Sequence, residues 1–129
     1  MEFFIFKDMT ELEIKNFEKV LENNDYTKVK ETWWNKSDYQ YYKAFYSINS
    51  DKKELLYQIF FEFWDFTKYT DSPNDWNISV TIMPESRIAG RKDLSLSVDW
   101  VTNLHKVEYM AQEFYKLVSR IDDLEIIEA

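Results

Sequence analysis

The sequence of 129 residues contains no cysteine. This absence excludes a disulfide framework, a thiolate zinc site and a catalytic thiol. It is typical of proteins from a reducing compartment, and we expect a cytoplasmic location.

Glycine occurs once, at Gly90, whereas glycine fills about 7% of positions in an average protein. A single glycine cannot supply the GxGxxG or GxxxxGK[ST] loops that bind phosphate groups. It also excludes the GxSxG turn that carries the nucleophile of many serine hydrolases. Asn and Asp must therefore occupy most turn positions that need a positive φ.

Long apolar runs are also missing, since no segment approaches the ~20 residues needed to span a bilayer. The N-terminal segment, residues 1–13, has a short apolar stretch, but Glu2 stands where a signal peptide carries basic residues. These features predict a soluble intracellular protein without a signal peptide.

Acidic residues are in excess, with 24 Asp and Glu against 16 Lys and Arg, and the net charge is −8. This charge repels nucleic acid and anionic membranes and attracts basic surfaces, such as the nucleic-acid-binding cleft of another protein. The same charge also keeps a small protein soluble, so it does not by itself require a partner.

Two segments have helical periodicity. The first covers residues 11–23, where Thr10 and Glu13 have the spacing of a capping box and apolar residues recur at three- and four-residue intervals. The second covers residues 103–120, with an apolar stripe that begins at Leu104 and Val107. The tail after it, residues 122–129, either extends this helix or docks as a short strand.

Between the helices the apolar period changes to two, which is typical of strands in an antiparallel sheet. The expected strands are 27–34, 38–48, 54–66, 76–82 and 93–100, and 76–82 and 93–100 alternate most clearly. Residues 3–6, ahead of the first helix, form either a short strand or an N-terminal arm. The clearest loop is residues 70–75.

The segment 57–66, YQIFFEFWDF, fits two interpretations. A helix would align Glu54, Gln58, Glu62 and Asp65 in one polar stripe. A strand is favoured because aromatic and β-branched residues suit a pleated surface, and because the neighbouring segments are strand-like. The strand places one set on the helix-facing side, namely Tyr57, Ile59, Phe61 and Phe63.

The resulting fold class is α+β, with residues 1–129 in a single two-layer domain. We expect a five-stranded antiparallel meander with an N-terminal and a C-terminal helix packed on one face, in the order α-β-β-β-β-β-α.

The sequence offers little chemistry for catalysis. His105 is the one histidine, and no metal-binding spacing surrounds it, so we expect a partly exposed helix residue. Asp71, Asn74 and Asp75 could bind a hard cation, but turn formation explains them better. A pair chosen among 24 carboxylates carries no specific signal. We therefore predict a protein that is not an enzyme and needs no cofactor or metal.

Aromatic residues make up 19% of the chain, more than one covered sheet face can bury. Because neighbouring residues of a strand point to opposite faces, the face away from the helices should expose aromatic side chains, which often mark an interface. The alternatives are that the tail, the N-terminal arm or a second copy of the chain covers this face. The predicted contact residues are Trp33, Trp34, Tyr42, Tyr46, Phe60, Glu62, Trp64 and Phe66.

A basic cluster, Arg87, Arg91 and Lys92, lies in the expected hairpin loop between 76–82 and 93–100. It is either a second part of the contact surface, able to grip a phosphate or an acidic patch, or a solvated hairpin tip. Aromatic sheets that bind single-stranded nucleic acid have basic surroundings, so direct nucleic-acid binding is disfavoured here.

In size, acidity and glycine-poor, Lys/Asn-rich composition, the chain resembles small α+β proteins of bacterial mobile elements and toxin systems. These are the immunity proteins of nuclease toxins and the phage-encoded inhibitors of CRISPR effectors. The resemblance implies a stoichiometric inhibitor of a basic nuclease or ribonucleoprotein effector, and it assigns no residue roles. The alternatives are a structural homodimer that buries the aromatic face, and a small enzyme that uses carboxylates or His105.

Overall fold

A computed structural model describes residues 4–30, 37–49, 52–84 and 104–128, and within them the side chains of 8–30, 37–47, 53–83 and 104–117. The elements run in the order β1 (Phe4–Met9), α1 (Glu11–Asn23), β2 (Thr27–Val29), β3 (Tyr39–Asn49), β4 (Lys52–Asp65), the 3₁₀ turn η1 (Phe66–Lys68), β5 (Trp76–Pro84) and α2 (Leu104–Glu128).

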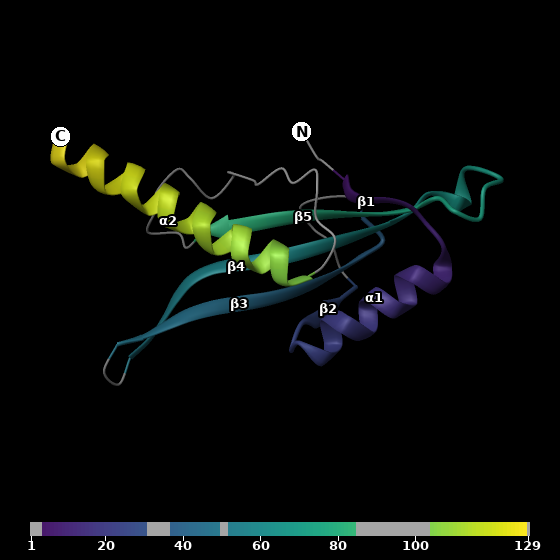
Figure 1. The fold of residues 1–129 in the computed structure, drawn as a ribbon, viewed down its shortest axis with the longest axis horizontal. Helices are drawn as coiled ribbons and strands as arrows, with labels where there is room; N and C mark the ends of the chain where they lie inside the picture. Colours follow the sequence, from purple (N-terminus) through teal and green to yellow (C-terminus); the bar gives the residue numbers. More distant parts are fainter. Residues whose placement is uncertain (1–3, 31–36, 50–51, 85–103, 129) are drawn as a thin grey trace.

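The strands form one antiparallel sheet in the order β1-β5-β4-β3-β2 (Figure 1). This confirms the predicted fold class, an α+β domain with a five-stranded antiparallel sheet and a helix near each end of the chain. Strands β2 to β5 form a meander, and β1 pairs with the free edge of β5. The described fifth strand is thus the N-terminal segment, while residues 31–34 and the expected strand 93–100 lie outside the described residues.

Strand β4 is central and pairs with β3 on one side and β5 on the other. The strand prediction for 54–66 is therefore confirmed as far as Asp65, while Phe66 begins η1, and the helical interpretation is wrong. The alternating residues Tyr57, Ile59, Phe61 and Phe63 are at most 6% exposed. Two flanking strands satisfy the backbone N–H and C=O groups of β4, which a helix would have to satisfy within the segment.

Helix α1 begins as its sequence predicts. The Thr10 hydroxyl accepts a hydrogen bond from the Glu13 N–H at 3.1 Å, and the Glu13 carboxylate accepts one from the Thr10 N–H at 3.1 Å. These reciprocal bonds satisfy two N–H groups that the first turn leaves without helical partners. Its apolar stripe then buries Ile14 and Leu21 against the sheet.

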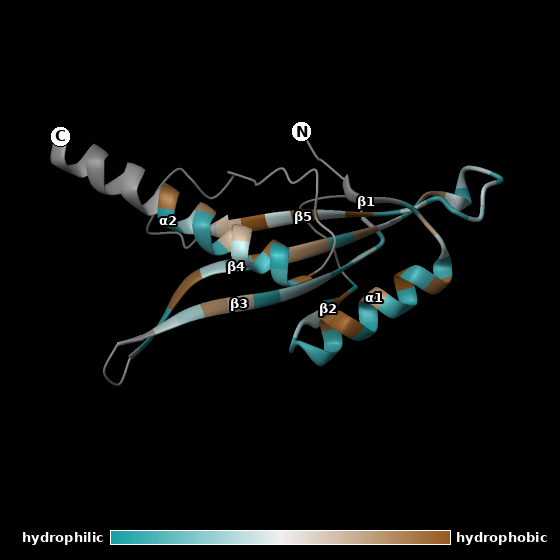
Figure 2. Cartoon of the chain, viewed as in Figure 1, coloured by the Kyte–Doolittle hydropathy of each residue, from teal (hydrophilic) through white to brown (hydrophobic). Residues whose placement is uncertain are grey.

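Both helices pack on the same face of the sheet, as predicted (Figure 1). Phe17 of α1 contacts Phe61 with ring centroids 5.6 Å apart, and α2 adds Leu104, Val107 and Ala111 to the same core. Hydrophobic residues recur along β4, β5 and both helices (Figure 2). Residues 122–128 continue α2, so the tail extends the helix, one of the two alternatives that the sequence left open.

Candidate binding pocket between the C-terminal helix and the sheet

A pocket of about 600 Å³ lies between α2 and the paired strands β3 and β4. Its volume falls in the range of about 300–1,000 Å³ that is usual for ligand sites. The sheet contributes Phe45, Tyr46, Leu56 and Tyr57, and α2 contributes His105, Glu108, Tyr109, Gln112, Tyr115 and Lys116.

The helix wall of the pocket follows from the periodicity of α2. His105, Glu108, Tyr109 and Gln112 recur at spacings of three and four and therefore share one side of the helix. The neighbouring stripe that begins at Leu104 is buried in the core. One side of α2 thus holds the helix on the sheet, and the adjacent side lines the pocket.

The sheet wall depends on a β-bulge. Phe45 pairs with Tyr57, but Tyr46 pairs with Leu55, so the register shifts by one residue and Leu56 is the extra one. In a regular strand the neighbours Phe45 and Tyr46 would point to opposite faces, as the sequence predicts. Bulges redirect side chains, and both residues line the pocket here.

Aromatic rings support one another inside the pocket. The Phe45 and Tyr57 rings stack at 4.9 Å between centroids, with 15° between their planes. The Tyr57 ring lies 5.3 Å from that of Tyr115 on α2. This row of rings joins strand to strand and sheet to helix, so the wall is held in place from both sides.

Glu108 is the half-buried carboxylate of the pocket, with 21% of its side chain exposed. Its Oε2 accepts a hydrogen bond from the Tyr26 hydroxyl at 3.1 Å, and its Oε1 lies 3.7 Å from His105 Nδ1. Burial first, and then the charge of Glu108, raise the pKa of Tyr26 far above its ordinary value, and the same two causes raise the pKa of Tyr57. Glu108 thus places a negative potential on the aromatic wall.

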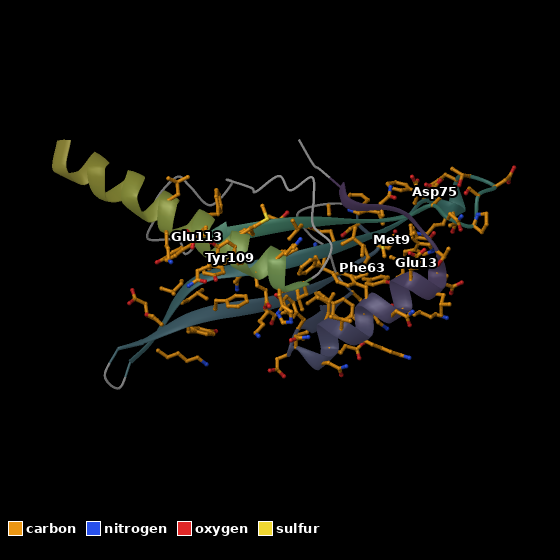
Figure 3. The ribbon with its side chains drawn as sticks, viewed as in Figure 1. Met9, Glu13, Phe63, Asp75, Tyr109 and Glu113 are labelled. Atoms are coloured by element: carbon orange, nitrogen blue, oxygen red, sulfur yellow. The ribbon has the colours of Figure 1, made fainter. Side chains whose placement is uncertain are left out.

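The other polar residues of the pocket are more exposed. His105 stands in the first turn of α2 with 83% of its side chain exposed, as the sequence predicts. Lys116 lies at the pocket wall, and its Nζ is 3.4 Å from the carboxylate of Glu113. Figure 3 shows Tyr109 and Glu113 on α2, well separated from Glu13 and Asp75.

The sheet face away from the helices differs from the prediction at its centre. Phe60 and Glu62 are only 7% and 1% exposed, so the chain itself covers this face at both positions, one of the alternatives that the sequence left open. Tyr42 stacks on Phe60 with centroids 5.7 Å apart. These contacts place Phe60 and Glu62 in the packing of the chain itself, and their role in partner contact stays a prediction.

A row of hydrogen bonds crosses the same face. The indole N–H of Trp64 donates to the Ser79 hydroxyl at 2.9 Å, and that hydroxyl donates to Glu62 Oε2 at 2.9 Å. Trp64 and Phe66 are half-buried and stack at 6.0 Å. Neighbouring strands β4 and β5 bring these groups together, because Glu62 and Ser79 pair in register.

Of the predicted contact residues, Tyr46 lies at the pocket and is 44% exposed. The roles of Tyr42, Trp64 and Phe66 in partner contact stay predictions. The remaining predicted residues lie outside the described part of the chain, namely Trp33, Trp34, Arg87, Arg91 and Lys92.

Sequence reasoning missed the pocket residues of α2. One of them, Tyr109, is a large aromatic residue that is 64% exposed. The spacing of His105, Tyr109, Gln112 and Lys116 along the polar side of the expected helix was a signal that could have indicated a shared surface. The bulge that completes the pocket has no comparable mark in the sequence.

The loop between η1 and β5 is held by its own polar groups, since the Thr70 hydroxyl donates to Asp75 at 2.7 Å. Within the described ranges, no three His, Asp or Glu side chains gather as a candidate metal site. Neither helix of the described residues has the length and hydropathy needed to cross a membrane.

No family model, curated protein or solved structure matches this chain. What the protein binds is therefore inferred from its own residues.

Proposed function

We propose that this protein is a stoichiometric binding module for a basic protein, and that the pocket and its rim form the contact surface. The observation that carries the proposal is the exposure of Tyr46 (44%) and Tyr109 (64%) at an aromatic pocket on a protein of net charge −8. Tyrosine is enriched among the residues that contribute most to binding energy at protein interfaces.

The rigidity of the pocket wall supports this role. Phe45 stacks on Tyr57, and Tyr57 contacts Tyr115, so the wall joins two strands and α2. A wall ordered in advance lowers the entropy cost of binding, because fewer side chains must be fixed when the partner arrives.

The charge supports a basic partner. An acidic protein attracts a basic surface at long range and associates with it faster at low ionic strength. The class of partner that we propose is a nuclease or ribonucleoprotein that acts on nucleic acid in bacteria, because such proteins present basic clefts. The module would then inhibit its partner by occupying that cleft.

This proposal places the contact surface at the pocket and not on the sheet face that the sequence suggests. Phe60 and Glu62, in the middle of the other sheet face, are buried in the chain. Tyr46 belongs both to the contact residues predicted from the sequence and to the pocket. Tyr109, on α2, belongs to the pocket alone.

The test begins with affinity capture from a bacterial host and purification of the captured protein, followed by calorimetric titration. The expected result is a basic protein that binds in a one-to-one complex. Replacing both Tyr46 and Tyr109 by alanine should weaken binding by about tenfold or more, because exposed interface tyrosines are frequent hot spots.

The matched control is Tyr69→Ala. Tyr69 is 80% exposed and follows η1, outside the residues that line the pocket. It should leave the affinity unchanged. Equal affinities for the double variant and the control would refute the proposed surface, and a self-associating chain with no captured partner would support the homodimer instead.

A further inference from the structure

We propose that the pocket receives one arginine side chain of the basic partner, with Glu108 as the counter-charge of its guanidinium group. The inference rests on the proposed function and specifies the chemistry by which the pocket recognises its partner. It is argued from the aromatic wall, the position of Glu108 and the distribution of charge around the pocket.

Ring faces of the pocket already attract cations within the chain. Lys53 Nζ lies 4.2 Å from the centroid of the Tyr46 ring, and Lys43 Nζ lies 5.3 Å from that of Phe45. A cation over an aromatic face is drawn to the negative potential of that face. Both lysines approach from strands β3 and β4, so a partner's cation fits best against the α2 wall.

Glu108 supplies the charge at that wall. Its carboxylate is half-buried and lines the same pocket as the row of rings formed by Phe45, Tyr57 and Tyr115. Of the described side chains, only the exposed His105 comes within ion-pair distance of it. A half-buried carboxylate gains most from a cation that enters the same low-dielectric site.

The positive charge of Lys116 does not oppose this assignment. Its Nζ lies 3.4 Å from Glu113, whose carboxylate offsets the charge outside the pocket. An anionic ligand would meet the negative charge of Glu108, and a purely apolar ligand would remove water from that carboxylate without replacing it.

Arginine suits the pocket better than lysine. A planar guanidinium stacks on aromatic rings and can donate two parallel hydrogen bonds to one carboxylate. Tyr109 and Tyr115 provide the rings on the α2 side, and Glu108 provides the carboxylate. Lysine offers a compact, strongly hydrated charge that stacks less well.

The first test compares two peptides on the wild-type protein, acetyl-Gly-Arg-Gly-amide and the same peptide with citrulline in place of arginine. Citrulline keeps the shape of the side chain and removes its charge. Backbone amide shifts in NMR titrations should show saturable binding of the arginine peptide, with a Kd on the order of millimolar. Citrulline should bind at least tenfold more weakly, and equal binding of both peptides would overturn the inference.

The second test uses Glu108→Gln, with Glu11→Gln as the control. Both substitutions remove one negative charge, but Glu11 pairs with Lys15 on the exposed side of α1, and neither residue lines the pocket. The Glu108 variant should bind the arginine peptide at least tenfold more weakly, and the control should stay within about twofold of the wild type. Equal loss in both variants would show that the effect is one of net charge and would contradict the site.

The two proposals fail separately. If the captured partner depends on Tyr46 and Tyr109 but arginine and citrulline peptides bind alike, the binding surface stands and the guanidinium site is wrong. If the arginine peptide is selected but the tyrosine variants keep full affinity for the partner, the pocket binds guanidinium and the proposed function is wrong. The peptide comparison on the wild type needs no variant, so it decides even if Glu108→Gln lowers stability.

Discussion

The hydroxyl of Tyr26 donates a hydrogen bond to Oε2 of Glu108 across 82 positions of the chain, at 3.1 Å. Tyr26 is 4% exposed and stands between α1 and β2, whereas Glu108 belongs to α2 and lines the pocket. This bond ties the segment between α1 and β2 to α2 at the candidate site. The orientation of the pocket carboxylate therefore depends on a residue near the N-terminal helix.

Replacing Tyr26 by phenylalanine removes this hydroxyl and keeps the ring. We expect the free energy of unfolding to fall by about 1–3 kcal/mol, because a half-buried carboxylate loses a hydrogen bond. Chemical denaturation monitored by circular dichroism measures the change. The control is Tyr69→Phe. The Tyr69 side chain is 80% exposed, so the loss of its hydroxyl should leave the stability unchanged. Equal stabilities of both variants would show that the bond contributes nothing measurable.

Alkaline pH should destabilise the fold through its buried tyrosines. Burial first, and then hydrogen bonds to Glu22 and Glu18, raise the pKa of Tyr41 far above its ordinary value of 10. The folded protein then keeps this proton while the unfolded chain loses it above pH ~10, so the stability conferred by the neutral hydroxyl is present below that pH and is lost as pH rises.

The measurement is the free energy of unfolding at pH 8 and at about pH 10.5 for the wild type and for Tyr41→Phe. Stability should fall more steeply between these values in the wild type than in the variant. Ultraviolet absorbance should show in parallel that the buried tyrosines ionise only when the fold is lost. Parallel pH profiles for the two proteins would contradict the raised pKa.

The capping box of α1 should contribute to stability through a single hydroxyl. Thr10→Ala removes the acceptor for the Glu13 N–H and should cost about 1 kcal/mol, the usual cost of losing an N-cap. Thr10→Ser keeps the acceptor and should stay close to the wild type. Thermal unfolding followed by circular dichroism compares the variants, and an alanine variant as stable as the serine variant would argue against the cap.

Ser79 should stabilise the buried polar row on the other sheet face. Its hydroxyl accepts from Trp64 and donates to Glu62, and Ser79→Ala removes both bonds at once. We expect a loss of about 1–3 kcal/mol, because the bonds are buried or half-buried. The fluorescence emission of the folded protein should change at the same time, because Trp64 loses its hydrogen-bond partner. A loss of stability alone would leave the emission of the folded state unchanged.

The control for this variant is Ser72→Ala. The Ser72 hydroxyl accepts a single bond at 3.3 Å from the Asn74 N–H in an exposed loop, so its loss should be nearly neutral. Unchanged stability in both serine variants would mean that other contacts hold Glu62 and Trp64 in place.

Much of the fold could be predicted from the sequence. The start of α1, the strand at 54–66 and the set of β4 residues that faces the helices follow from spacing and side-chain shape. Capping depends on residues three positions apart, and alternation depends on the pleat of a single strand. The sequence left residues 3–6 open between a strand and an N-terminal arm, because an edge strand such as β1 is defined by its pairing with β5 and not by its own six residues.

Most of the candidate site could not be predicted from the sequence. The aromatic excess predicted a contact surface beyond the core, and alternation alone placed it on the face where Phe60 and Glu62 are buried. The pocket instead needs the bulge beside Phe45 and Tyr46, which brings two neighbouring residues of each strand toward α2. A one-residue change of register leaves no periodic signal that a sequence pattern could reveal.

By itself, the sequence determined the features that arise over short distances along the chain: the capped helix at Thr10, the alternation of β4, and the charge of −8. These features depend on local hydrogen bonds, side-chain spacing and composition. Only the tertiary structure decided that Glu62 is buried beside Ser79 and that Tyr26 meets Glu108. Such contacts join residues far apart in the chain, and their geometry is set by the packing of whole elements, which no single segment encodes.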